Sequence, residues 1–219
     1  MAEKLQEMSF LEHFSALRKC ILFCVLSIIA TTLVSLSQVK LIWGWLLLPM
    51  PPQQELSLIN IAPTEALLID FKVALLAGIF LASPLLFWFF YNFLSPALFK
   101  KEKLLFLPIV LFSVLFFLAG AGFSFGVVLP LSFEFLNKYA QGVASQSWTQ
   151  SNYLNFSMRM ILAFAIMFQL PVITFLLAKL KLITATFLIQ QARIAILVIF
   201  IVAALLTPPE IISQMLLAL

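Results

Sequence analysis

The sequence predicts an all-α polytopic membrane protein, and three features of the chain lead to that fold class. Of the 219 residues, 63% are hydrophobic and only 10% are charged, and the mean hydropathy is +1.13. Soluble globular chains carry about a quarter charged residues, so this chain has too few charges to cover a water-facing surface. The apolar residues gather in runs of membrane-spanning length. This hydrophobic composition excludes a disordered protein, and a net charge of +4 without a basic stripe excludes a nucleic-acid-binding protein.

Residues 1–19 are predicted to form a cytoplasmic amphipathic segment that leads into the membrane. Ser9 followed three residues later by Glu12 is a capping box, so Glu12 either closes a helix start or binds a ligand. His13 is either an interfacial hydrogen-bonding residue or a functional one, and Arg18 is a candidate topology anchor. Four apolar residues recur at helical spacing and form one face that can lie on the bilayer surface: Phe10, Phe14, Leu17 and Ile21.

Five apolar runs are predicted to span the membrane, because a hydrocarbon core of about 30 Å needs about 20 apolar residues and tolerates shorter runs by local thinning. They cover residues 20–37, 73–99, 104–133, 154–178 and 194–206. Residues 39–72 are mixed and rich in tryptophan and proline, which favours a structured loop with interfacial aromatics. A last apolar run, residues 211–219, is expected to be the start of a sixth span that is cut off. Prolines inside the runs predict kinked helices: Pro84, Pro96, Pro108, Pro130 and Pro171.

The distribution of basic residues predicts a cytoplasmic N-terminus. With that orientation, nine of the 13 lysines and arginines face the cytoplasm. This excess is the one that the positive-inside rule expects, and it places long loops outside and short loops inside. Four basic residues remain on the outer side: Lys40, Lys72, Lys138 and Arg159.

No catalytic or metal-binding machinery is visible in the sequence. Residues 122–126, GFSFG, match the nucleophile-elbow pattern, but they lie inside a predicted helix, and the sole histidine is predicted on the other side of the membrane. The same two glycines form a Gly-x-x-x-Gly pair, and we expect them to support close helix packing. With one histidine and no clustered carboxylates, we expect no metal, no cofactor and no enzymatic activity.

Three polar residues in, at or between the predicted spans have a structural interpretation to consider. Glu65, at the start of the second span, is commonly structural there because carboxylates favour the positive end of the helix dipole. Gln169 lies deep in the fourth span, where it either joins helices or contacts a bound molecule. Glu102 stands among three lysines in a short inner loop, where surface pairing would contribute little.

Four motifs, taken in this order, resemble the TatC family, the polytopic subunit of the twin-arginine protein translocase. Residues 10–18, FLEHFSALR, are similar to its F-L-x-H-L-x-E-L-R, and residues 62–66, APTEA, to its S-P-T-E-x. Residues 93–98, FLSPAL, followed by Glu102, resemble F-x-x-P-x-L and a short loop with H-E-R. Residues 206–214, LTPPEIISQ, resemble L-T-P-P-D-x-x-S-Q. The resemblance runs from Phe10 to the last residue.

The resemblance implies six helices, both ends in the cytoplasm and a concave, glove-like body. It implies recognition of signal peptides with paired arginines, and transport of folded proteins driven by the proton-motive force. TatA- and TatB-type single-span proteins, twin-arginine precursors and membrane lipid are the expected partners, and the chain is expected to be oligomeric. The bacterial inner membrane is the expected location, with a thylakoid or mitochondrial membrane as the alternative.

Paired arginines call for carboxylates at the membrane surface, so the resemblance makes Glu102 the first candidate arginine receptor. The family glutamate near the N-terminus is replaced by Ala16, and we hypothesise that Glu12, one helical turn earlier, substitutes for it. The other residues assigned to signal-peptide binding are Arg18, Phe93 and His13. Gln169, where the family often has glutamate, is assigned with four others as translocation or structural positions: Pro49, Glu65, Glu210 and Gln214.

Two alternative functions stay open at this point. A small-solute or ion transporter would suit kinked helices and a buried Gln169, but such proteins usually show more buried ionisable residues and an internal repeat. A non-catalytic scaffold that gathers single-span helices through its apolar flanks is the other alternative. Dependence on the arginines of a leader peptide would separate both from the translocase interpretation.

Overall fold

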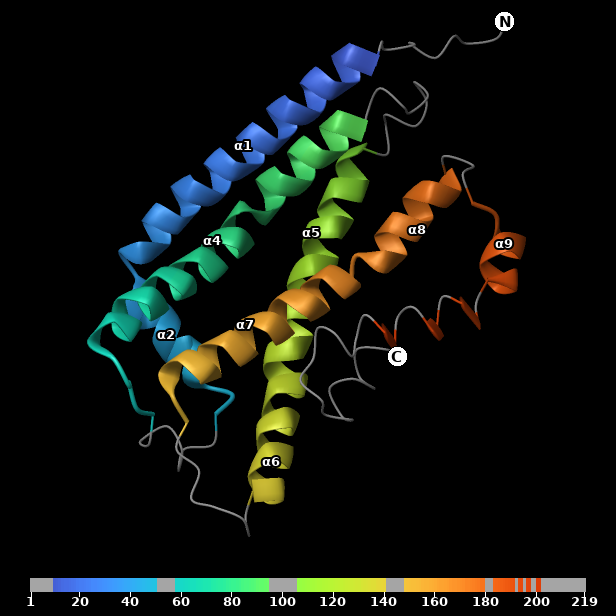
Figure 1. The fold of residues 1–219 in the computed structure, drawn as a ribbon. Coiled ribbons are helices and arrows are strands. Elements are labelled where there is room, and N and C mark those ends of the chain that lie inside the picture. The colour runs from blue at the N-terminus through green and yellow to red at the C-terminus, as the bar shows by residue number, and fades with distance from the viewer. Residues whose placement is uncertain are drawn as a thin grey trace, which may run out of the picture. The chain divides into compact units, whose positions relative to one another are not determined.

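The computed structural model describes residues 10–50, 58–94, 106–140, 148–179 and 183–191, together with residues 193, 194, 196, 197, 200 and 201 (Figure 1). These residues are almost entirely helical, with one isolated bridge between Ile59 and Thr149. The elements are α1 (Phe10–Leu36), α2 (Val39–Leu47), α4 (Pro63–Leu94), α5 (Phe106–Phe123), the π-helical η3 (Ser124–Val128), α6 (Leu129–Ala140), α7 (Gln150–Met167), α8 (Leu170–Lys179) and α9 (Ala185–Gln190).

Within the described residues, four helical stretches are long and apolar enough to cross a membrane. They are Phe14–Leu36, Pro63–Leu94, Leu107–Lys138 and Gln150–Lys179. This confirms the predicted all-α polytopic membrane fold. The predicted amphipathic segment does not form a separate helix in its described part. Its described residues continue directly into the first span as the single helix α1. Most of the predicted span 194–206, and all of residues 211–219, lie outside the described residues.

The stretch predicted as a loop, residues 39–72, contains helix at both of its ends, so that interpretation was wrong there. Val39–Leu47 is α2, an apolar segment that ends before Pro49. The second spanning helix starts at Pro63, ten residues before the predicted span. Proline suits the first position of a helix, since its missing N–H needs no partner there and its φ is already helical. Scanning for apolar runs misses this start, because the first turns of α4 are mixed in polarity.

The chain divides into two compact units. The first unit contains Met1–Gln38 and Ala74–Leu115, and the second contains Val39–Val73 and Phe116–Leu219. In the first unit, α1 lies beside the later part of α4 (Figure 1). Thr31 Oγ1 lies 2.8 Å from the carbonyl oxygen of Gly78, and the rings of Phe23 and Phe89 stack with centroids 5.4 Å apart.

Gly78 is the point of closest approach between α1 and α4. A Cβ atom built on Gly78 would lie 2.9 Å from both the backbone N and the Cα of Thr32. Only glycine therefore fits without moving one helix. The first unit is also held by a buried pair, since the hydroxyls of Tyr91 on α4 and Ser113 on α5 lie 2.9 Å apart. Polar pairs of this kind join helices where lipid offers no hydrogen-bond partner.

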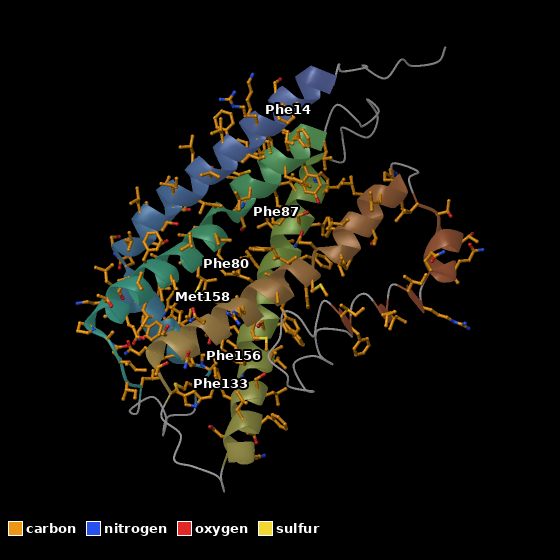
Figure 2. All side chains as sticks on the ribbon, in the orientation of Figure 1. Phe14, Phe80, Phe87, Phe133, Phe156 and Met158 are labelled. Carbon is orange, nitrogen blue, oxygen red and sulfur yellow. The ribbon has the colours of Figure 1, made fainter. Side chains whose placement is uncertain are left out.

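An aromatic cluster around Phe133 is the core of the second unit. The ring of Phe133 is fully buried, stacks on Tyr153 at 5.1 Å and meets Trp148 edge-on at 5.6 Å. Phe156 lies 5.3 Å away by ring centroid, and Figure 2 labels Phe133 and Phe156 at the α6–α7 contact. The hydroxyl of Tyr153 donates a hydrogen bond of 2.5 Å to the carbonyl of Leu46. This contact ties the end of α2 to α7.

The Gly122–Gly126 pair does not form the close helix contact that its spacing predicts. No described atom outside the local helix lies within 4 Å of a Cβ built on either glycine. The π-helical turn η3 starts at Ser124, and its extra residue rotates the following positions away from the face of the preceding turns. Gly120 makes the close approach instead, because a Cβ there would lie 2.6 Å from the carbonyl oxygen of Phe164. Ser124 lies within helix and is fully buried, which excludes a nucleophile elbow.

Candidate functional site

Arg18 and Phe93 are the residues predicted to bind a signal peptide whose side chains the structure describes, and both belong to the first unit. The contacts Thr31–Gly78 and Phe23–Phe89 show that α1 and α4 run antiparallel. Moving about five residues from Phe23 toward the start of α1 reaches Arg18, and the matching step along α4 reaches the region of Phe93. The two therefore lie at a similar level of the first unit.

Exposure distinguishes these two residues. Arg18 is exposed near the start of α1, whereas Phe93 is half-buried in the last turn of α4, where it has its own contacts within the protein. An exposed cation and a partly covered aromatic ring at a similar level are typical of a membrane–water interface, where long cationic side chains and aromatic rings each keep one end in contact with water.

Three predicted binding residues cannot be placed by their side chains. The backbones of Glu12 and His13 belong to the first turn of α1, but their side chains lie outside the described residues. Glu102 also lies outside them, on the segment that connects Leu94, the last residue of α4, with Phe106, the first residue of α5. The assignment of these three residues to signal-peptide binding therefore stays a prediction.

Glu65 closes the N-terminus of α4. One carboxylate oxygen accepts hydrogen bonds from the backbone N–H groups of Ile61 at 2.9 Å and Ala62 at 3.5 Å, and the residue lies in the first turn of the helix. These N–H groups precede the helix and have no partner inside it, so the carboxylate performs half of a capping box. The favourable interaction with the helix dipole adds to the same effect. This geometry supports the structural interpretation of Glu65.

Pro49 is buried in the turn that follows α2. Backbone hydrogen bonds from Leu48 to Trp45 and from Met50 to Leu47, of 3.1 Å and 2.9 Å, form this turn, and Met50 is only 4% exposed. The fixed φ of proline suits a chain that must stop a helix and change direction. Pro49 thus shapes the backbone beside the contact between Leu46 and Tyr153.

Gln169 lies at the break between α7 and α8 and is 7% exposed. Its N–H donates to the carbonyl of Ile166 at 2.9 Å, a tighter turn than an α-helix makes, and its own carbonyl accepts from Ile173 at 2.9 Å. The break arises because Pro171, two residues later, has no N–H to continue the ladder. The burial shows that Gln169 faces protein, where the residue makes a further interaction. Glu210 and Gln214 lie outside the described residues.

A polar contact that sequence reasoning missed connects Lys72 on α4 with Asn155 on α7. The ammonium of Lys72 donates to the side-chain oxygen of Asn155 at 2.9 Å. The two residues are 83 positions apart, so no local pattern indicates the pair. The only available signal was that a lysine in an apolar helix needs a polar partner.

Comparisons with known proteins agree on one family. Residues 12–219 match the family described as Sec-independent protein translocase protein (TatC). TatC of Carboxydothermus hydrogenoformans is 34% identical over 212 residues, which cover 96% of this chain and 87% of the relative. TatC of Helicobacter pylori J99 is 40% identical over 163 residues, which cover 74% and 66%. A crystal structure titled as the twin arginine translocase receptor TatC matches with a TM-score of 0.82 at 30% identity and covers 94% of this chain and 92% of that one.

Proposed function

Because the chain belongs to the TatC family of Sec-independent protein translocase proteins, we propose that it is the receptor for twin-arginine signal peptides. It is the core subunit of the translocase that moves folded proteins across the bacterial inner membrane, driven by the proton-motive force. One observation carries this function: the fold matches a crystal structure titled as the twin arginine translocase receptor over 94% of the chain. The transporter alternative gains no support from these matches.

The proposed binding surface lies where α1 begins and α4 ends. Glu102 and Glu12 receive the two arginines of the leader, because a carboxylate and a guanidinium form strong charge-assisted hydrogen bonds, and these are worth more near a bilayer than in bulk water. Phe93 offers an apolar contact to the hydrophobic stretch that follows the arginines. His13 and Arg18 complete the polar rim. The shared level of Arg18 and Phe93 in the first unit supports this surface.

The remaining assigned residues act on the shape and stability of the protein. Glu65 caps α4 and Pro49 directs the turn after α2, as their hydrogen bonds and burial indicate. Gln169 either joins helices at the α7–α8 break or contacts a passing peptide. Glu210 and Gln214 belong to the motif of residues 206–214, which leads into the last apolar run.

TatA- and TatB-type single-span proteins are the proposed partners, and the protein works as an oligomer without enzymatic turnover. Helix α1 has a long apolar surface on which lipid or a partner helix can pack, since residues such as Leu33 and Val34 are more than 60% exposed. Apolar surface of this extent is stable only against lipid or another transmembrane helix.

The test is photo-crosslinking of a twin-arginine precursor to the protein in inverted membranes, with the crosslinker beside Glu102. We expect Glu102→Gln to reduce capture about tenfold and the double variant Glu12→Gln/Glu102→Gln to reduce it further, since each removes one charge-assisted contact. Glu134→Gln is the matched control, because that carboxylate is exposed and paired with Lys138 in the second unit.

Two results separate the function from the site. Failure of the wild-type protein to distinguish a twin-arginine from a twin-lysine precursor would refute the receptor function. Equal capture by the wild type and by the double variant would refute the assignment of Glu12 and Glu102 while leaving the receptor function intact.

A further inference from the structure

Two cationic side chains lie at matching depths in two spanning helices of the second unit. Lys72 is nine residues after Pro63, the start of α4, and Arg159 is nine residues after Gln150, the start of α7. At 1.5 Å per residue, each lies about 13 Å into its helix. Among the described residues, neither has a carboxylate partner, since the ion pair found there joins Lys138 and Glu134. Cations within a membrane span are rare and mark functional positions.

The hydrogen bond from Lys72 brings the two cations to the same face of α7. Its ammonium group lies 2.9 Å from the side-chain oxygen of Asn155, which is four residues before Arg159. Residues four apart are neighbours on one helix face, with about 5–6 Å between Cβ atoms. The oxygen of Asn155 is neutral, so it satisfies one N–H of the ammonium but adds no negative charge beside the two cations.

The exposed residues of α7 show which surface of the protein lies beside the two cations. Within this helix, the exposed residues are Asn152, Arg159 and Ile166, which recur every seven residues and so form one stripe. The Cα–Cβ bonds of a helix tilt toward its N-terminus, so the side chain of Arg159 leaves the backbone in the direction of Asn155. A long cationic side chain on an apolar face extends in this way toward the polar headgroups. Phe71, next to Lys72, is 51% exposed, so apolar surface borders the cations.

We propose that Lys72 and Arg159 form a binding site for the phosphate of an anionic phospholipid headgroup. The planar guanidinium binds two phosphate oxygens at once, and the ammonium adds a point charge beside it. The phosphate would give the two cations an anionic partner, because neither makes an ion pair with a carboxylate among the described residues. A lipid fits better than a free phosphate ion, because the stripe continues from Arg159 to Ile166, where an acyl chain can lie against 61% exposed apolar surface. The site belongs to the second unit and does not depend on the signal-peptide surface.

The test is native mass spectrometry of the purified protein titrated with phosphatidylglycerol, and in parallel with phosphatidylcholine, which carries the same phosphate without net charge. We expect Lys72→Gln and Arg159→Gln each to weaken phosphatidylglycerol binding about tenfold, and Arg159→Lys to weaken it less because the charge remains. Lys138→Gln, which removes an exposed cation from α6, is the matched control and should bind as the wild type does.

Circular dichroism and the thermal midpoint of lipid-free protein show whether each variant is folded. Arg159 is exposed and Lys72 is half-buried, so a substitution of Arg159 is expected to disturb the fold less. Wild-type affinity for phosphatidylglycerol in folded Arg159→Gln would overturn the proposal. An equal loss in Lys138→Gln would overturn it as well, because the effect would then be one of net charge. Complete competition by millimolar inorganic phosphate would show an anion site filled from solution and would overturn the lipid as its occupant.

Discussion

Replacing Gly78 by alanine tests the closest helix contact in the first unit. The new Cβ would lie 2.9 Å from the backbone N and Cα of Thr32, whereas ordinary contacts of this kind are 3.4–4 Å. Backbone atoms cannot rotate away, so α1 and α4 must separate by roughly half an ångström. Overpacking of this kind costs about 1–3 kcal/mol. Separation also weakens the hydrogen bond between Thr31 Oγ1 and the carbonyl of Gly78.

Gly122→Ala is the matched control. Both glycines are helical, so both substitutions gain about 1 kcal/mol of helix propensity, and this gain cancels in the comparison. No described atom outside the local helix lies within 4 Å of a Cβ at Gly122. We therefore expect Gly78→Ala to be about 1–3 kcal/mol less stable than Gly122→Ala. For a chain of this length that difference corresponds to about 2–4 °C in Tm per kcal/mol.

The assay is thermal unfolding of both variants in the same detergent, followed by the far-ultraviolet helical signal. A further comparison with Thr31→Val separates the hydrogen bond from the steric effect, since such bonds between membrane helices average about 0.6 kcal/mol. Equal midpoints for Gly78→Ala and Gly122→Ala would refute the reasoning, because the close contact with Thr32 would then not exist in the folded protein.

Three further predictions concern the second unit and are measured in the same unfolding assay. Tyr153→Phe should cost about 1–2 kcal/mol, because it leaves the carbonyl of Leu46 without its 2.5 Å donor; no change would mean that water satisfies that carbonyl. Phe133→Ala should cost about 3–5 kcal/mol, since it empties the centre of the aromatic cluster, and a loss below 1 kcal/mol would contradict that central role. Glu65→Ala should cost about 1 kcal/mol through the lost cap, whereas Glu134→Ala, an exposed pair, should change stability little; equal effects would argue against capping.

The sequence alone determined the class of the protein and most of its spanning segments. Long apolar runs with few charges can be stable only in a bilayer, and spanning length is a local property of the chain. The family motifs are local as well, since FLEHFSALR and APTEA each lie in consecutive residues. For the same reason, the motif APTEA placed Glu65 at the entry to the second helix, although the apolar run put the span itself only at residue 73.

Features that depend on residues distant in the sequence required the tertiary structure. Spacing alone favoured Gly122 and Gly126 as contact glycines, but the π-helical turn at Ser124 rotates the face, and the contacts are made by Gly78 and Gly120. Helix α2 was missed because tryptophan and proline dominate the composition around it. The pairing of Lys72 with Asn155 was also out of reach, because a hydrogen bond across 83 residues depends on how α4 and α7 pack. Packing joins surfaces from different helices, and no periodicity within one helix specifies which partner it meets.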